Sequence, residues 1–468
     1  MLAAPQSSRA SRAAQPWVPV ALAVVAAIVR LPTFLSSRTL SFDDGVYGAS
    51  VVDMRRGLIP YRDLFSSQGP LHLPLLYAGD ALGLHTIDAP RLTPLVAGIV
   101  IAIAIWAVAR RLGAAAWAAA VAGLLVATTG TMLWTTGQIT GDGPAAALTA
   151  LAAWVAVVYR DDPRWWRAVL AGALFGGGLA TKPTAIAAIV PLAVWLLASR
   201  RRAHLFWAAA AVVGVWLAAA VPFGLARVWH QSVEYHTGAG PSYAPLVQLE
   251  KLTTTLVTRD AIVVVAVVLG MVAAARSGRR ALPRSDVGLL GIWFVLTAIV
   301  LVFEKAMYAN HVATIILPLA LLGAVRPPPW RWLALALAVL VPWQIVNQRD
   351  ILWPPHMTGV DAQVVARLRA LPRGAEAIAD DPGLVWRAGL TTPAQMNDTT
   401  DMRVFQGQIT TRVVAEAAAS ARTCAVVITP GGFGVQLLGL RSAISAVGYH
   451  LAHAYGPDRE LWLRPCID

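Results

Sequence analysis

The sequence predicts an all-α membrane protein with about eleven transmembrane helices, a long first outer loop containing surface helices, and a small C-terminal α/β domain. Three observations lead to this prediction. The chain is 57% hydrophobic and 13% charged, which is more apolar material than a water-soluble core can bury. Apolar runs of about 17 to 25 residues, long enough to cross a bilayer, recur as far as residue 349. From about Pro354 the hydropathy falls, so we divide the chain into a membrane domain, residues 1–353, and an extracytoplasmic domain, residues 354–468.

The boundaries of the apolar runs are soft by several residues. Their cores are Trp17 to Leu35, Leu92 to Ala109, Ala114 to Leu133, Pro144 to Tyr159, Ala168 to Ala180, Thr184 to Ala198, Leu205 to Leu225, Ala261 to Ala275, Val287 to Phe303, Val312 to Val325 and Trp332 to Val346. Three consecutive cores, which together span residues 144–198, are short, and one of them is a candidate for a re-entrant segment instead of a full crossing.

The distribution of arginine predicts the orientation. With the N-terminus in the cytoplasm, six successive cytoplasmic segments are all basic, as the positive-inside rule requires. They contain Arg9 and Arg12, Arg110 and Arg111, Arg160 with Arg164 and Arg167, Arg200 to Arg202, Arg276 with Arg279, Arg280 and Arg284, and Arg326 with Arg331. The net charge of +13 therefore indicates membrane topology and not nucleic-acid binding.

This orientation places the C-terminal domain outside the cell. No small-residue cleavage site follows the first apolar run, so we expect that run to be a retained span and not a removed signal peptide. Alanine richness and the use of arginine in place of lysine are typical of a GC-rich bacterial genome. We therefore expect a multi-pass protein of the bacterial plasma membrane with a cytoplasmic N-terminus.

Residues 36–91 form the long first outer loop, and its pattern predicts two helices. Ser41 with Asp44 three residues later is a capping-box arrangement, and Gly57 supplies a C-terminal stop, so a short helix on the membrane surface is expected between them. A second helix is expected from about Pro70 to Leu84. The stretch between the two helices contains Pro60 and reads as an extended turn.

The C-terminal domain has the pattern of a small α/β fold. Strands are expected at Glu376 to Ala379 and Cys424 to Thr429, and helices at Thr410 to Ala421 and Val435 to Ala446, with further strand material at the end of the chain. The two cysteines, Cys424 and Cys466, can pair in an oxidising compartment. The alternative, a small buried hydrophobic residue and a free thiol in the tail, explains them equally well.

Asp43 and Asp44 form the most informative motif, a pair of adjacent carboxylates at a membrane surface. A carboxylate in the first turn of a helix is stabilised by the helix dipole, so one of the two can be a simple cap. A cap leaves the other acid unexplained. We therefore interpret the pair as catalytic: one carboxylate is a general base that deprotonates an acceptor hydroxyl, and the other orients it or holds its charge.

Cations near the same face predict a phosphate site. The chain has three lysines, Lys182, Lys251 and Lys305, and all are expected on the outer side. A compact ammonium at headgroup level suits a phosphate anion, although snorkelling to the interface explains a single lysine equally well. Arg62 adds a cation to this face, and Tyr308 stands three residues after Lys305.

Five further residues are candidates for lining the substrate cleft: Tyr61, Gln68, His72, Asp142 and His311. Asp142 is a third carboxylate at the cleft or an N-terminal helix charge, and the histidines are ligands, acid–base groups or structural residues. No His, Cys or Asp cluster has the spacing of a zinc site, so no metal or other cofactor is expected. A hard divalent cation held by Asp43 and Asp44 is possible but not favoured.

The order of these motifs resembles that of the polyprenyl-phosphate-dependent glycosyltransferases of the C superfamily, in the branch of protein O-mannosyltransferases and lipid A aminoarabinose transferases. The resemblance rests on the acidic pair after the first span, Gly57 to Asp63, Gln68-Gly69-Pro70, Lys182-Pro183, and Lys305 with Tyr308 ahead of Leu317 to Ala320. It covers roughly residues 17–349. It implies that Asp43 is catalytic, that Asp44 stands where many relatives have glutamate, and that Lys182, Arg62, Lys305 and Tyr308 contact the donor phosphate.

The predicted function is transfer of a sugar from a polyprenyl-phosphate donor to an acceptor hydroxyl on the outer face of the membrane. A single displacement would invert the anomeric centre, and the acceptor can be a lipid, a glycan or a protein. The alternative is a transporter or flippase of lipid-linked sugars, which would place ionisable residues or broken helices near the bilayer midplane. A third interpretation, a scaffold whose C-terminal domain binds a partner, leaves the acidic pair unexplained.

Overall fold

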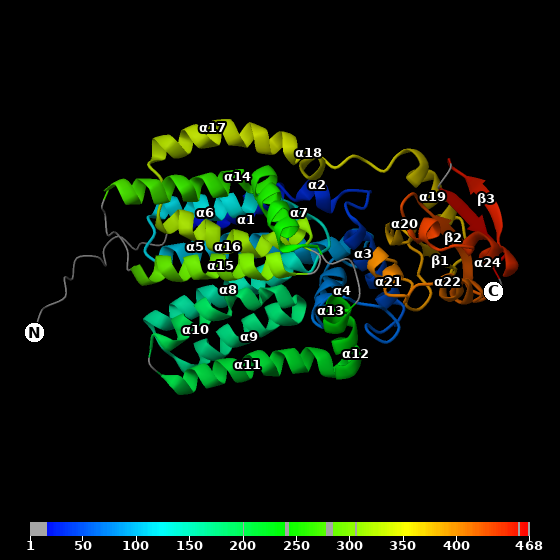
Figure 1. Ribbon diagram of the computed structural model, residues 1–468, viewed down its shortest axis with the longest axis horizontal. Coiled ribbons are helices and arrows are strands. Elements are labelled where there is room, and N and C mark those ends of the chain that lie inside the picture. The colour runs from blue at the N-terminus through cyan, green and yellow to red at the C-terminus, as the bar shows by residue number, and fades with distance from the viewer. Residues whose placement is uncertain are drawn as a thin grey trace, which may run out of the picture.

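The computed structural model describes residues 16–199, 201–238, 243–277, 284–304, 307–456 and 459–466. Long helices run side by side in one part of the molecule, and a small sheet with short helices forms the other part (Figure 1). Two helices, α3 (Phe42–Arg55) and α4 (His72–Leu82), lie where the two parts meet. The protein therefore consists of a helical bundle, a connecting layer and a C-terminal domain.

The bundle contains a helix at every apolar run of the sequence. Its elements are α1 (Trp17–Ile28), α2 (Leu31–Phe34), η1 (Ala89–Arg91), α5 (Leu92–Arg111), α6 (Ala116–Thr128), α7 (Gly130–Gly137), α8 (Asp142–Asp161), α9 (Trp165–Thr181), η2 (Pro183–Ala188), α10 (Ile189–Leu197), α11 (Arg202–Ala220), η3 (Val221–Phe223), α12 (Leu225–Trp229), η4 (His230–Glu234), α13 (Tyr235–Thr237), α14 (Pro245–Ser277), α15 (Arg284–Phe303), η5 (Ala309–Val312), α16 (Ala313–Val325), α17 (Trp330–Asn347) and α18 (Arg349–Leu352).

Among the described residues, six helices are long and apolar enough to cross a membrane. The number rises to seven if α6 and α7, which are bent by 57° at their junction, form one broken span. Three shorter apolar helices, at Trp17–Ile28, Pro183–Leu197 and Ala309–Val325, account for further runs. A multi-pass membrane protein is thus confirmed, whereas the count of eleven crossings stays a prediction.

Small residues allow the bundle helices to approach one another closely. A Cβ atom on Gly172 of α9 would lie 2.1 Å from the carbonyl oxygen of Ala208 in α11, and one on Gly176 would lie 2.7 Å from the carbonyl oxygen of Val212. Close contact of this kind is the usual packing solution inside a bilayer, where apolar surface gains little from helix association. In contrast, α11 and α17 expose most of their side chains and present them to the surroundings of the bundle.

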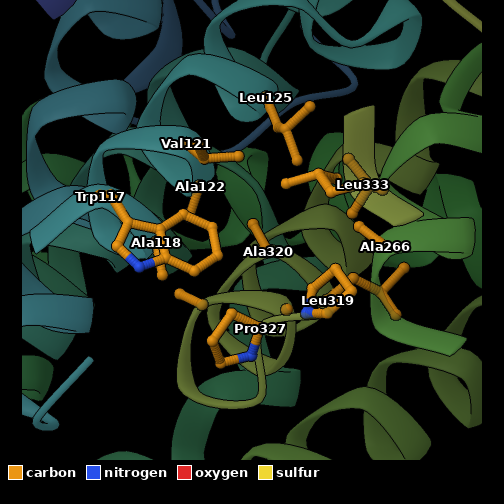
Figure 2. Close-up of a pocket in the computed structure, with 14 residues that line it drawn as sticks. Trp117, Ala118, Val121, Ala122, Leu125, Ala266, Leu319, Ala320, Pro327 and Leu333 are labelled. Carbon is orange, nitrogen blue, oxygen red and sulfur yellow. The ribbon is translucent and has the colours of Figure 1, made fainter. Parts of the chain in front are cut away.

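A small pocket lies between α6, α14, α16 and α17 (Figure 2). Its lining is apolar and includes Trp117, Val121, Leu125, Leu319 and Leu333. Because no ionisable side chain lines it, this pocket suits hydrocarbon and is separate from the charged residues described below.

Helix α3 begins where the Ser41–Asp44 pair predicts, since the Asp44 backbone N–H donates to Ser41 Oγ at 3.3 Å. After the helix ends at Arg55, Gly57 adopts a φ of 87°, which glycine tolerates best. The short helix is present as expected, residues 44–53 are buried within the protein, and its position on a membrane surface stays a prediction. Sequence patterns local to α3 do not reveal that the C-terminal domain covers it.

The C-terminal domain is built on a four-stranded sheet of order β1-β2-β4-β3, in which β1 and β2 are parallel and the other pairs antiparallel. Its elements are α19 (Gly359–Arg369), β1 (Glu376–Ala379), α20 (Pro382–Ala388), α21 (Asp401–Phe405), α22 (Thr411–Ala418), β2 (Thr423–Ile428), α23 (Phe433–Gln436), α24 (Leu440–Ala446), β3 (His450–Ala454) and β4 (Glu460–Leu463). Alternate residues of β2 enter two separate apolar clusters, so both faces of the sheet are covered.

Three of the four elements predicted in this domain occur within three residues of their expected bounds. The fourth, a helix at Val435 to Ala446, is wrong as a single element, because Gly439 with a φ of 75° separates α23 from α24. Cys424 and Cys466 form a disulfide with a Cα–Cα distance of 5.2 Å, which resolves the alternative left open by the sequence.

Candidate active site

Asp43 lies in the first turn of α3 and is only partly buried. Among the described residues, none forms a hydrogen bond or ion pair with its carboxylate. Burial raises the pKa of Asp43 from 3.8 to about 6, and the charges of Asp142 and Asp398 act in the same direction. Lys182 and His311 oppose this shift. Within the part of the chain that the structure describes, Asp43 is therefore an unpartnered carboxylate with a raised pKa, close to Lys182 and His311.

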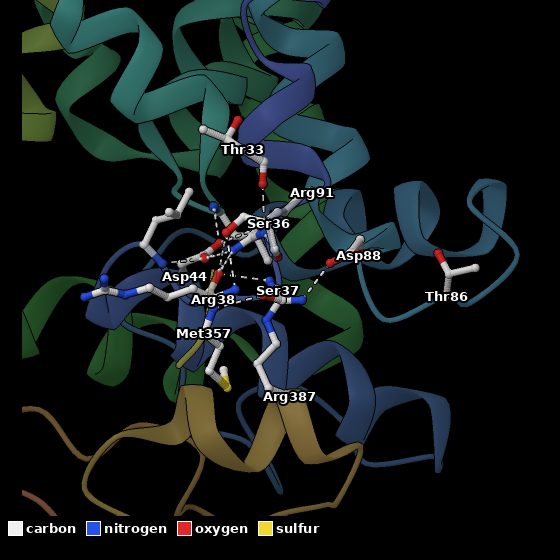
Figure 3. A network of polar contacts seen from close by, with 12 residues as sticks. Thr33, Ser36, Ser37, Arg38, Asp44, Thr86, Asp88, Arg91, Met357 and Arg387 are labelled. Atoms are coloured by element: carbon white, nitrogen blue, oxygen red, sulfur yellow. Dashed lines mark hydrogen bonds and ion pairs between the residues drawn. The ribbon is translucent and has the colours of Figure 1, made fainter. Parts of the chain in front are cut away.

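Asp44 has a different environment, although it is the next residue in the chain. Its carboxylate is fully buried and forms an ion pair with both Nε and Nη2 of Arg91 (Figure 3). It also accepts hydrogen bonds from the backbone N–H groups of Leu40 and Ile139, both at 3.0 Å. Asp44 thus ties the start of α3 to η1 and to the loop before α8, and both its oxygens are occupied.

Arg91 is the centre of this network. Besides Asp44, it donates hydrogen bonds to three backbone carbonyl groups: that of Thr33 in α2 and that of Ser36 just after it, both at 2.8 Å, and that of Arg38 at 2.6 Å. The planar fork of arginine can serve several oxygens at once, which a lysine cannot reproduce. Arg91 therefore holds Asp44 and the segment that precedes the acidic pair.

Lys182 forms the second charged centre. Helix α9 ends at Thr181, just before Pro183, and this leaves Lys182 in an extended conformation. Its ammonium group lies 2.8 Å from the Asp142 carboxylate, in the first turn of α8. Asn310 donates to the same oxygen of Asp142 at 2.9 Å, whereas the other oxygen is buried and has no partner among the described residues. Lys182 is 5% exposed, so the pair is well shielded from bulk water.

His311 brings a third element, η5, to this centre. Its Nδ1 lies 2.8 Å from a carboxylate oxygen of Glu304, and its ring packs edge-on against Tyr308, with centroids 5.5 Å apart. Tyr308 is 54% exposed and receives the ammonium group of Lys251 at 5.5 Å from its ring centroid. Tyr308 and Lys251 therefore form an open side of the charged cluster. Lys305 lies outside the described residues.

His72 is completely buried in the first turn of α4, and neither of its ring nitrogens has a partner among the described residues. Its ring packs edge-on against Tyr47 of α3, with a centroid distance of 4.5 Å. Burial, with the charge of Lys182, lowers the pKa of His72 to about 3. The imidazole is therefore neutral at physiological pH and cannot act as a phosphate-binding cation.

Tyr61 and Gln68 organise the loop between α3 and α4. The Tyr61 hydroxyl donates to the Gln68 carbonyl oxygen at 2.7 Å, and Tyr61 itself adopts a φ of 63°. The backbone N–H of Gly69 donates to the carbonyl oxygen of Thr181 at 3.1 Å, so the loop is attached directly beside Lys182. Tyr61 and Gln68 are both buried, and their contacts stabilise the conformation of this loop.

Arg62 is not brought together with the other predicted phosphate ligands. Its side chain is 52% exposed and pairs with the neighbouring Asp63 at 2.7 Å. Neither Asp43 nor Lys182 contacts it among the interactions of the described residues. An exposed ion pair of this kind contributes little and points to a solvated arginine.

The structure also adds residues that the sequence did not single out for the site. Asp398, from the C-terminal domain, is 2% exposed and close enough for its charge to raise the pKa of Asp43. Asn310 and Glu304 flank the predicted His311, and proximity in sequence was the only available signal for them. No group of three His, Cys, Asp or Glu side chains within the described ranges is arranged to hold a metal ion.

The arrangement resembles known membrane glycosyltransferases. The fold matches that of ArnT from Cupriavidus metallidurans bound to undecaprenyl phosphate, with a TM-score of 0.68 over 96% of this chain and 98% of that one, at 16% sequence identity. The oligosaccharyltransferase of Archaeoglobus fulgidus, in complex with Zn and sulfate, matches with a TM-score of 0.52 over 95% of this chain and 72% of that one, at 14% identity. The class is thus a multi-pass membrane protein with a glycosyltransferase fold.

A family model also matches part of the sequence. Residues 67–225 match the family model described as dolichyl-phosphate-mannose-protein mannosyltransferase. No curated protein sequence matches the chain significantly. Over residues 67–225, about a third of the chain, the sequence is therefore similar to this family, and the fold of the chain is similar to that of ArnT.

Proposed function

We propose that this protein transfers a sugar from a polyprenyl-phosphate donor to an acceptor hydroxyl at the outer face of the membrane. The observation that carries the proposal is the contrast within the acidic pair. Asp44 is fully occupied by Arg91 and backbone N–H groups, whereas Asp43 has no hydrogen-bond or ion-pair partner within the described ranges, has a pKa of about 6 and lies near Lys182 and His311. The ArnT structure with bound undecaprenyl phosphate supports a donor of this chemical class.

In the proposed reaction, Asp43 accepts the proton of the acceptor hydroxyl as its oxygen attacks the anomeric carbon of the sugar. The bond from that carbon to the phosphate oxygen breaks, and its electron pair leaves with the polyprenyl phosphate. The cation of Lys182 stabilises the negative charge that develops on this phosphate. Asp43 then returns the proton to solvent. A single displacement of this kind inverts the anomeric configuration.

Asp142 has a supporting role in this scheme. An ammonium group has three donors, and the ion pair with Asp142 uses one direction, which leaves Lys182 able to approach a phosphate. The opposite charge of Asp142 at 2.8 Å also offsets part of the free-energy cost of burying the Lys182 side chain. Tyr308 and Lys251 border the exposed side of the cluster, where we place the entrance for the lipid head group.

The transporter alternative is less well supported. Helix α14 is broken at Asp260, where φ is −132°, and broken helices are common at transport sites. However, the carboxylate of Asp260 is occupied by the backbone N–H of Thr131, at 3.0 Å, and by its hydroxyl. This acid therefore stabilises the start of α7 and does not offer a free site.

Transfer from synthetic sugar-linked polyprenyl phosphates to acceptors in a membrane extract tests the proposal. The reconstituted protein should release free polyprenyl phosphate and incorporate labelled sugar, and Asp43→Asn should lower the rate by about 10² to 10⁴-fold. Arg62→Ala, which alters an exposed cation outside the cluster, is the matched control and should retain activity. If the wild-type protein moves labelled lipid across liposomes but transfers no sugar from a broad donor panel, the proposal is wrong.

A further inference from the structure

The first turns of α3, which carry Asp43, are in backbone contact with α20 of the C-terminal domain. A Cβ atom on Gly48 would lie 2.2 Å from the Trp386 ring, and one on Gly45 would lie 2.6 Å from the backbone nitrogen of Gly383. Side chains larger than hydrogen therefore have no room at either position. The two glycines are three residues apart, so they face α20 from the same side of the helix.

The later turns of α3 are attached to the segment that follows α20. The carboxylate of Asp53 accepts hydrogen bonds from Thr392, at 3.0 Å from its backbone N–H and at 2.6 Å from its hydroxyl. Asn397 donates to Ser50 Oγ at 2.9 Å. All of these residues are buried. Four positions along α3 are thus held by the C-terminal domain, over three turns of the helix.

A third set of contacts connects the domain to the residues that hold Asp44. The buried indole of Trp386 lies against two guanidinium groups, that of Arg91 at 5.2 Å and that of Arg387 at 3.9 Å from a ring centroid. Arg387 also donates to the Asp88 carboxylate at 2.6 Å (Figure 3). The domain therefore contacts α3 directly and also contacts the arginine that fixes the start of that helix.

We propose that α20 and residues 391–397 act as a positioning clamp that holds Asp43 in its catalytic place, so that the C-terminal domain is a working part of the active site. Trp386 and Thr392 are its positioning residues. The inference rests on the proposed sugar transfer, because it assigns the clamp to that reaction. It goes beyond the reaction because it assigns the C-terminal domain the role of positioning Asp43.

The clamp has a measurable consequence for Asp43. Lys182 at the end of α9, Asp142 of α8, His311 of η5 and Asp398 of the C-terminal domain act on the pKa of this carboxylate. The phenol groups of Tyr47 and Tyr308 also interact with it. Burial has a larger effect than any of them. Loosening α3 would admit water and move Asp398 away, and both changes lower the pKa of Asp43 towards its ordinary value.

Trp386→Ala, compared with Ile444→Ala, tests the proposal. Both substitutions remove a completely buried side chain from the C-terminal domain, but Ile444 belongs to the cluster on α24, away from α3. We expect Trp386→Ala to lower kcat at least tenfold, to change the donor KM less than twofold, and to move the acidic limb of the pH–rate profile to lower pH. Ile444→Ala should lower the thermal stability but leave kcat and the pH profile unchanged.

Thr392→Val is a milder variant that keeps the backbone hydrogen bond to Asp53 and loses only the hydroxyl, in case Trp386→Ala does not fold. It should lower kcat about threefold to tenfold, with a wild-type donor KM. Hydrogen exchange of the α3 amides supplies a readout that needs no substrate, and exchange should become faster in Trp386→Ala and Thr392→Val but not in Ile444→Ala.

Wild-type kcat, pH profile and α3 exchange in both clamp variants would overturn the inference. So would effects identical to those of Ile444→Ala. A wild-type protein that transfers no sugar would instead refute the proposed function, and the exchange experiment would still decide whether the domain holds α3.

Discussion

The ionisation of Asp43 should set the pH dependence of sugar transfer, because only the carboxylate form can accept the acceptor's proton. With the pKa raised by burial to about 6, about one tenth of the protein is active at pH 5 and about nine tenths at pH 7. A carboxyl with its ordinary pKa of 3.8 would already be more than about nine tenths ionised at pH 5. The two cases therefore differ by about tenfold in rate at pH 5.

Initial rates of transfer between pH 4.5 and pH 8, at donor concentrations well below KM, measure this difference. We expect kcat/KM to fall about tenfold per pH unit below pH 6, and the residual rate of Asp43→Asn to be nearly independent of pH in this range. An acidic limb near pH 4, or a limb near pH 6 that persists in Asp43→Asn, would refute the reasoning.

Thermal unfolding supplies the control. Because the pKa of Asp43 is higher in the folded protein than in the unfolded chain, ionisation opposes folding. The stability contributed by this residue is present below about pH 4, decreases as the pH rises through about 6, and stays low above that. Asp43→Asn should therefore raise the melting temperature at pH 8 relative to the wild type, which separates loss of catalysis from loss of fold.

Three further predictions concern the surroundings of the site. Lys182→Met should leave the buried Asp142 charge without its cation, so it should lower the unfolding free energy by about 3–5 kcal/mol in denaturant titrations and raise the donor KM. The double variant with Asp142→Asn should recover the stability but not the activity. Arg62→Ala should alter transfer rates less than about twofold, because its exposed ion pair with Asp63 is outside the cluster. Cys466→Ser should destabilise the C-terminal domain by about 4 kcal/mol in unfolding experiments, because the disulfide closes a loop of 42 residues. A reducing agent should have the same effect on the wild type. An unchanged stability would contradict this prediction.

Much of the fold was predictable because its signals are local. Apolar runs mark the bundle helices, Ser41 marks the start of α3, and the apolar stretch from Cys424 marks β2. The same patterns predicted that the acidic pair lies in the first turn of α3 and that Lys182 lies at the end of α9. The split at Gly439 was missed, since a glycine within a helical pattern is often tolerated and only its backbone conformation shows a break.

The division of roles within the acidic pair was not predictable. Asp43 and Asp44 have the same side chain and adjacent positions, so only tertiary contacts distinguish them. The ion pair of Asp44 with Arg91 spans 47 residues of sequence, and the bonds that tie α3 to the C-terminal domain span more than 330. A periodicity or a motif carries no information about partners at such distances, and Asp398 was missed for the same reason.

The sequence separation between α3 and its contacts on the C-terminal domain has a consequence for biogenesis. Synthesis proceeds from the N-terminus, so residues 42–55 reach the membrane long before Trp386 and Thr392 have left the ribosome. Until the last quarter of the chain has been synthesised and folded, α3 lacks its contacts with α20 and residues 391–397. A newly inserted protein would therefore remain inactive towards the membrane's pool of activated sugar until its assembly is complete.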